Sequence, residues 1–120
     1  MKNAKVIKTA RNKYQQAREE FGSFHLGETV FIEPSIARRG DPIRINYQGL
    51  LKNSGADAVY LHYGFDRWNS PQTVAMYPSP EGIFQAEVRA NGNYEMNFCF
   101  KDSANNWDNN SGQDWSITLQ

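Results

Sequence analysis

The sequence predicts a mainly β protein, an antiparallel immunoglobulin-like β-sandwich with an added N-terminal amphipathic helix. Two patterns in the 120 residues lead to this prediction. Apolar residues recur at spacings of three and four near the N-terminus, as in a helix, and at every second position from Thr29 onward, as in strands. We therefore expect a helical extension over residues 1–27 and a sandwich domain over residues 28–120.

The N-terminal helix is predicted by an apolar stripe whose intervening positions are charged or amide residues. The members of the stripe are Ile7, Ala10, Tyr14, Ala17, Phe21 and Phe24. Gly22 or Gly27 would end the helix. We favour docking of this stripe on the chain's own sandwich, because three short heptads make a weak coiled coil. An oligomer formed through the helix stays open as an alternative.

Strands are predicted where short alternating runs lie between turn-forming clusters such as Arg39-Gly40-Asp41-Pro42 and Asn91-Gly92-Asn93. The predicted strands are Thr29 to Ile32, Ile43 to Leu51, Ala58 to Phe65, Thr73 to Tyr77, Ile83 to Ala90, Tyr94 to Phe100 and Ser116 to Leu119. About seven short strands at this spacing are typical of an immunoglobulin-like sandwich.

The alternation also assigns side chains to the two faces of the sheets. The inward set is Ile43, Ile45, Tyr47, Val59, Leu61, Tyr63, Phe84, Ala86, Val88, Tyr94, Met96, Phe98, Phe100, Ile117 and Leu119. The opposite face includes Arg44, Asn46, Tyr60, His62, Gln85, Glu87, Arg89, Glu95 and Asn97.

Composition excludes several classes of function. Lys and Arg number 13, as do Asp and Glu, so there is no net field to attract nucleic acid or an acidic membrane. No run is apolar enough to span a bilayer or to act as a signal peptide, so we expect a cytoplasmic protein, or a secreted one if a signal peptide has been removed. A single cysteine, Cys99, forms no internal disulfide or zinc cluster, and we expect no cofactor.

Exposed aromatic residues are the candidate functional groups. His62 alternates with Leu61 and Tyr63, so it points out of the sheet, and Trp68 follows in a polar turn. Trp107 lies among asparagine and aspartate residues that form turns and direct amide groups to solvent. Indole rings can stack on the apolar face of a sugar, and amides can bond its hydroxyls.

Two structural interpretations compete with binding in the last loop. Trp115 stands directly before the last strand, and we expect it to pack in the core with Ile117 and Leu119. A metal site is a second alternative for the loop, because Asp102, Asp108, Asn110 and Asp114 have the oxygen ligands that calcium prefers. Their spacing does not fit the EF-hand pattern, so no metal site is predicted.

Two separated motifs resemble a known family. The first is Val59-Tyr60-Leu61-His62-Tyr63-Gly64-Phe65 followed by Trp68. The second is Phe98-Cys99-Phe100-Lys101-Asp102 followed by Trp107-Asp108-Asn109-Asn110-Ser111-Gly112-Gln113-Asp114-Trp115. Together, in this order, they resemble the starch-binding carbohydrate-binding modules of families 25 and 53, over residues 41–120.

The resemblance implies a β-sandwich that binds α-1,4-glucans such as starch, glycogen or maltooligosaccharides and has no catalytic activity. It implies that His62 bonds sugar hydroxyls, that Trp68 and Trp107 are stacking platforms, and that Asn109 and Asn110 are amide partners. It also implies an association with glucan-metabolising enzymes.

Two other functions compete with glucan binding. The same exposed aromatics and the helix could serve a protein-protein interaction or assembly module. An enzyme is not expected, because Asp66, Asp108 and Asp114 lie in hydrophilic loops without an apolar pocket to raise a carboxyl pKa, as a glycosidase acid requires.

Overall fold

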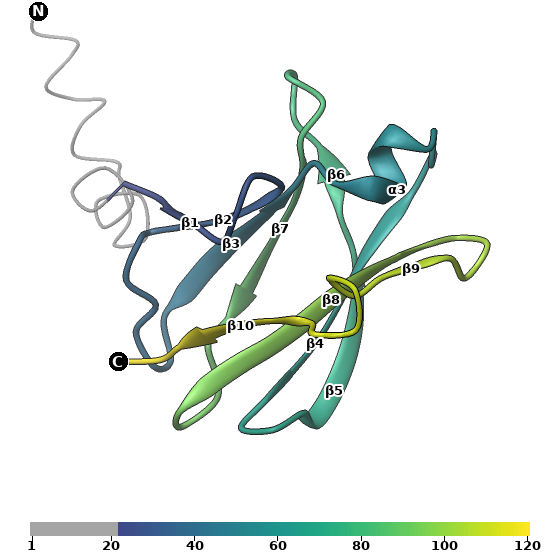
Figure 1. Ribbon diagram of the computed structural model, residues 1–120. Coiled ribbons are helices and arrows are strands. Elements are labelled where there is room, and N and C mark those ends of the chain that lie inside the picture. The colour runs from purple at the N-terminus through teal and green to yellow at the C-terminus, as the bar shows by residue number, and fades with distance from the viewer. Residues whose placement is uncertain (1–21) are drawn as a thin grey trace, which may run out of the picture.

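A computed structural model describes residues 22–120, which form two packed antiparallel sheets (Figure 1). The first sheet has the strand order β1 (Phe24–His25), β2 (Val30–Glu33), β3 (Pro42–Tyr47), β7 (Phe84–Arg89) and β6 (Tyr77–Pro78). The second has the order β10 (Trp115–Thr118), β8 (Glu95–Asp102), β4 (Val59–Phe65) and β5 (Asn69–Ala75), and β9 (Trp107–Asp108) also pairs with β8. A short helix, α3 (Leu50–Asn53), follows β3.

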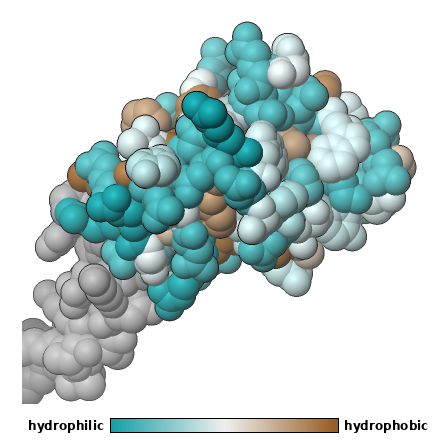
Figure 2. Space-filling model, turned by 90° about the horizontal axis from the view of Figure 1, so that it is seen from below, coloured by the Kyte–Doolittle hydropathy of each residue, from teal (hydrophilic) through white to brown (hydrophobic). Residues whose placement is uncertain are grey.

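The core lies between the sheets and is built by the alternation of each strand. Ile43, Ile45 and Tyr47 of β3 are fully buried, as are Met96 and its alternate neighbours on β8. Seen from below, the surface of the described residues is mainly hydrophilic, and apolar side chains appear only in small separate areas (Figure 2). The prediction of a mainly β protein with two antiparallel sheets is therefore confirmed.

The predicted immunoglobulin-like topology and the predicted N-terminal helix are not confirmed. The strand orders show no clear immunoglobulin-like topology. The predicted helix lies, as far as residue 21, outside the described residues, and so does most of the surface proposed for an oligomer. Phe24, the last member of the predicted stripe, lies in β1 instead, because its backbone pairs with Ile32 at the edge of the first sheet.

Two predicted strands have the wrong ends. The strand expected to reach Leu51 stops at Tyr47, and α3 follows, because the Leu51 N–H donates to the Tyr47 hydroxyl at 2.9 Å and turns the chain. A Cβ on Gly49 would lie 2.7 Å from the Tyr47 ring, so only glycine fits this turn. The strand expected over Thr73 to Tyr77 is divided between the two sheets at the buried Met76.

One face assignment also needs correction. Tyr94 was expected inside but is 73% exposed, because β8 begins only at Glu95 and Tyr94 precedes the covered part of the sheet. Asn46 and Asn97 are on the outward faces, as predicted, yet both are buried.

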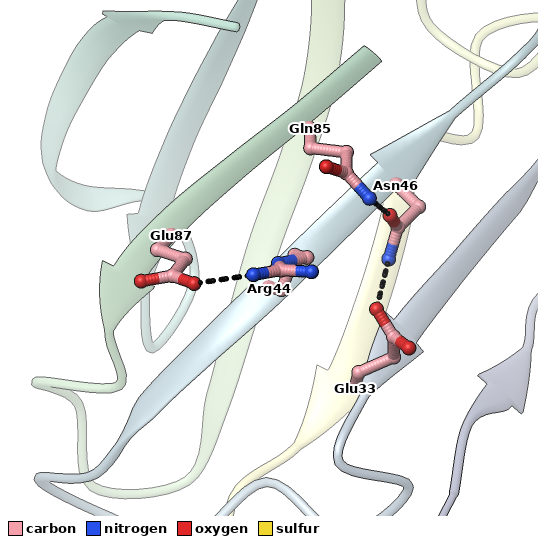
Figure 3. A network of polar contacts seen from close by, with 5 residues as sticks. All are labelled: Glu33, Arg44, Asn46, Gln85 and Glu87. Atoms are coloured by element: carbon pink, nitrogen blue, oxygen red, sulfur yellow. Dashed lines mark hydrogen bonds and ion pairs between the residues drawn. The ribbon is translucent and has the colours of Figure 1, made fainter. Parts of the chain in front are cut away.

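Asn46 is covered by a polar network on the outer face of the first sheet (Figure 3). Its amide nitrogen donates to Glu33 at 3.1 Å, and its carbonyl oxygen accepts from Gln85 at 2.8 Å. Arg44 pairs with Glu87 at 2.8 Å beside it. Such a network provides the hydrogen-bond partners that a buried amide needs.

No helix in the described part of the chain is long and apolar enough to cross a membrane.

Candidate functional site

Three aromatic rings meet on the outer face of the second sheet. The His62 ring is stacked on Trp68, with centroids 5.4 Å apart and an interplanar angle of 24°. The same ring meets Trp107 edge-on, also at 5.4 Å but at 82°. Since His62 is nearly parallel to one indole and nearly perpendicular to the other, the two indole planes are steeply inclined to each other.

His62 is positioned by the central strand of this sheet. It lies on β4, opposite Cys99 of β8 on one side and Thr73 of β5 on the other. Its Nδ1 is 2.8 Å from the Thr73 hydroxyl oxygen, and this hydrogen bond orients the ring. Burial, followed by the nearby Asp114 and Asp108 carboxylates, raises the pKa of the Cys99 thiol to about 12. This thiol stays protonated and is no nucleophile.

Trp68 lies on a tight turn after β4 that has an unusual backbone. Asp66, Arg67 and Trp68 have φ angles of 51°, 69° and 63°, in the left-handed region that side chains rarely adopt. Gly64 makes room for this turn, because a Cβ there would lie 3.1 Å from the Trp68 Cα. Such a backbone persists only when its surroundings hold it in place.

The Asp66 carboxylate provides that hold. Its oxygens accept hydrogen bonds from the backbone N–H groups of Asn93, Tyr94 and Glu95, at 2.9, 2.7 and 3.1 Å. The turn that displays Trp68 is thereby tied to the turn before β8. Hydrogen bonds to an ionised acceptor are stronger than neutral ones.

Asn97 adds a second tie to the same turn. Its side-chain oxygen accepts the Trp68 backbone N–H at 3.0 Å, and its side-chain nitrogen donates to Glu95 at 2.8 Å. Asn97 is 8% exposed, so both of these bonds are shielded from water. The turn is therefore fixed through its backbone, and the Trp68 indole is stacked on His62 without a hydrogen bond of its own being needed to hold the turn.

We expect Asp66→Asn to destabilise the protein in a pH-dependent way. Backbone hydrogen bonds, first from Asn93 and then from Tyr94, lower the pKa of the Asp66 carboxyl. A carboxyl with a lowered folded-state pKa stabilises the fold above its unfolded pKa of about 3.9, and this stabilisation is lost as the pH falls through the folded-state pKa. The variant should therefore unfold at a lower temperature than wild type at pH 7, and the difference should shrink below about pH 4.

Thermal unfolding followed by circular dichroism at several pH values measures this difference. Asp57→Asn is the matched control, because Asp57 is exposed and accepts no hydrogen bond in the part of the chain that the structure describes. Equal behaviour of the two variants would contradict the role given to Asp66.

Trp107 is held from the side of β8. It lies on β9 opposite Lys101, and 46% of its surface is exposed. The Lys101 ammonium lies 5.9 Å from the centroid of a Trp107 ring and 5.5 Å from that of Tyr60, and it donates to Asn105 at 3.0 Å. This cation–π contact steadies Trp107 and brings a hydrogen-bond donor to the edge of the aromatic cluster.

The residue after Trp107 ties the loop to the interior. The Tyr47 hydroxyl donates to the Asp108 carboxylate at 2.6 Å and accepts the Leu51 N–H. Burial, then the hydrogen bond to Asp108, raises the pKa of Tyr47 well above its usual value. Both effects favour the protonated hydroxyl, which is the form that donates to Asp108.

Asn109 and Asn110 have bonds within their own loop. The Asn109 side-chain oxygen accepts from the Gly112 N–H at 2.9 Å, and the Asn110 amide donates to the Asp114 carbonyl at 3.1 Å. Asn110 also lines a hollow of about 470 Å³ beside Leu26 and Trp115, distinct from the ring cluster. The structure thus brings His62, Trp68 and Trp107 together and does not bring Asn110 into that group.

The last loop holds Trp115 and the acidic residues that were candidate metal ligands. Trp115 is 7% exposed, so its predicted burial in the core is confirmed, and its ring contacts those of Phe98 and Phe100. Within residues 22–120, no three His, Cys, Asp or Glu side chains form a group that could hold a metal ion. Asp102, named as a candidate ligand, instead accepts hydrogen bonds from Ala104 and Asn106.

Sequence reasoning missed the residues that hold the rings in place. Asp66 and Asn97 fix the Trp68 turn, Lys101 contacts Trp107, and Thr73 orients His62. Alternation along β8 was a usable signal for Asn97 and Lys101, because it places both on the face of His62. No local pattern reveals Asp66, whose partners are 27 to 29 positions away.

Comparison with known proteins assigns a family to this arrangement. Residues 43–98 match the model of the starch/carbohydrate-binding module of family 53. An alpha-amylase of Clostridium acetobutylicum is 34% identical over 95 residues, which are 78% of this chain and 12% of the amylase. The chain therefore spans only a small part of that relative. No solved structure significantly matches the chain. Over residues 43–98, the chain belongs to the starch/carbohydrate-binding modules of family 53.

Proposed function

We propose that this chain binds α-1,4-glucans such as starch, glycogen and maltooligosaccharides without catalysis. Trp68 and Trp107 are the stacking platforms, His62 bonds sugar hydroxyls, and the Asn109 amide is a further polar partner. Asn110, the second amide that the resemblance implies, is left out of the site, because its amide donates to the Asp114 carbonyl and it lines a separate hollow. Each stacked ring contributes about 1 to 2 kcal/mol after desolvation, so two rings and a few hydrogen bonds give a dissociation constant in the micromolar range or weaker.

The steep angle between the two indoles is the observation that supports this ligand. His62 lies nearly parallel to Trp68 and nearly perpendicular to Trp107, so the platforms cannot form one flat surface. An α-1,4-glucan follows a curved path, and successive sugar rings present their apolar faces in different directions. A flat β-1,4-glucan such as cellulose would meet only one platform at a time.

A binding role also fits the carboxylate of the turn that carries Trp68. The pKa of Asp66 is lowered by its backbone hydrogen bonds, whereas a glycosidase general acid needs a raised pKa. Asp66 holds a turn and is unsuited to proton donation. The amylase to which the chain is similar leads us to propose that the module serves a glucan-metabolising enzyme by keeping it on its polymer.

Affinity electrophoresis tests the ligand class. Native gels containing soluble starch or glycogen should retard the protein, and gels containing hydroxyethyl cellulose or no polysaccharide should not. Added maltoheptaose should abolish the retardation by competition. Unchanged mobility in starch and glycogen would overturn the proposal and favour the alternative of a protein-protein interaction module.

His62→Ala should weaken maltooligosaccharide binding less than loss of either indole. A hydrogen bond to a hydroxyl contributes only about 0.5 to 1.5 kcal/mol against water, which corresponds to a loss of about two- to tenfold. Titration calorimetry measures the loss. Thr73→Val removes the 2.8 Å contact that orients His62 and keeps the imidazole, so it should give a smaller loss in the same direction. Full affinity in His62→Ala would remove His62 from the site.

A further inference from the structure

A second hollow adjoins the ring cluster on the far side of Trp107. It has a volume of about 630 Å³ and lies between α3 and the turn that joins β8 to β9. Trp107 lines it, while neither His62 nor Trp68 does. In Figure 1, α3 and β9 lie on the same side of the molecule, and residues of the two elements are in contact. The hollow therefore continues the surface on which Trp107 is displayed.

The lining of this hollow combines apolar and hydroxyl-bonding groups. Leu50 is 59% exposed on α3, whereas its neighbour Leu51 is buried in the core. Ser54, Ser103 and Asp57 contribute oxygen atoms around it. The side-chain nitrogen of Asn106 donates to Asp102 at 2.9 Å, and its side-chain oxygen, Oδ1, is the atom left to accept from a ligand. A pyranose needs this combination of an apolar contact and nearby polar atoms.

The order of residues along β8 places the hollow in line with the three rings. Asn97 contacts the Trp68 turn, Cys99 is paired with His62, and Lys101 is paired with Trp107. Asp102, the last residue of β8, borders the hollow. A strand rises about 3.3 Å per residue and alternates its faces, so Asn97, Cys99 and Lys101 follow one another along the outer face, while Asp102 belongs to the opposite face at the end of β8. A polymer that crosses Trp68 and then Trp107 reaches the hollow by continuing over Trp107, which lines it, past the end of β8.

We propose that this hollow is an additional subsite, which takes the sugar units of an α-glucan that continue past Trp107. Leu50 provides its apolar contact, and Asn106, Asp57 and the two serines bond hydroxyls. This subsite rests on the proposed function of the ring cluster. Its consequence is selectivity for chain length: a short oligosaccharide fills the rings alone, and a longer one also contacts Leu50.

Titration calorimetry with maltotriose and maltoheptaose tests the subsite. Leu50→Ala should leave the affinity for maltotriose within about twofold of wild type. It should lower the affinity for maltoheptaose about threefold or more, because only the longer sugar loses an apolar contact with Leu50. Ala104→Arg, which places a long side chain in the exposed turn lining the hollow, should have the same selective effect. Circular dichroism checks that both variants are folded.

Tyr77→Ala is the matched control. Tyr77 is 71% exposed on the first sheet and lies outside both the hollow and the ring cluster, so its loss should change neither affinity. If wild type binds both sugars and the two variants lower both affinities equally, or neither, the subsite is overturned and the proposed function stands. If wild type binds neither sugar, the proposed function fails and the subsite fails with it.

Discussion

Trp68→Ala and Trp107→Ala are each expected to weaken maltooligosaccharide binding at least about tenfold. A lost stacking face corresponds to about 1.4 kcal/mol or more. The loss should be clear for both, because each indole contacts His62 from a different direction and neither ring can replace the other. Titration calorimetry on variants with unchanged circular dichroism measures the effect.

Replacement by phenylalanine sharpens this experiment. Trp68→Phe and Trp107→Phe keep an aromatic face of smaller area, so each should lie between wild type and the alanine variant. Tyr77→Ala again serves as the unaffected aromatic control on the other sheet. If both alanine variants bind as wild type does, the platforms are assigned to the wrong residues, whatever the ligand.

Trp115→Ala should produce the largest loss of stability, with a decrease of about 3 to 5 kcal/mol in the free energy of unfolding. Trp115 is 7% exposed and packs on Phe98 at 6.3 Å and on Phe100 at 5.3 Å between ring centroids. Truncation leaves a cavity that these rigid neighbours cannot fill. Urea unfolding measured by circular dichroism gives the free energy directly.

Trp107→Ala is the matched comparison for this stability measurement, because it removes the same indole from an exposed position eight residues earlier in the chain. It should lower the free energy of unfolding far less than Trp115→Ala does. Only Trp107→Ala should remove a stacking platform for the sugar. Similar unfolding free energies for the two variants would show that burial does not separate their roles.

Several features of this protein follow from local patterns in the sequence. The alternation of β3, β4, β7 and β8 predicts both the strands and most of the core, because a two-sheet sandwich buries one face of each strand. Trp115 was placed in the core by its position before the last strand. His62 is predicted to point out of the sheet because it alternates with Leu61 and Tyr63, and Trp68 because it lies in a polar turn; the structure brings their rings into contact.

Other features depend on contacts between distant residues and leave no local pattern. The turn into α3 depends on the hydrogen bond from the Leu51 N–H to the Tyr47 hydroxyl. Leu50 and Leu51 give no sign of this bond in the sequence, where they look like the continuation of an apolar strand. Met76 divides one predicted strand because each half finds a partner in a different sheet. The sequence shows that the Trp68 turn is polar, but its conformation depends on Asp66. The partners of Asp66 are distant in the sequence: Tyr94 directly precedes β8, and Glu95 is its first residue.

The Tyr47 hydroxyl joins two surfaces that sequence places far apart. One buried oxygen receives the N–H of Leu51, in α3, and donates to Asp108, beside Trp107. One interior oxygen thus bonds both α3, which lines one side of the hollow, and the residue after Trp107, which lines the other side. The proposed subsite therefore has little order left to gain when a polymer binds, because that order is established when the chain folds.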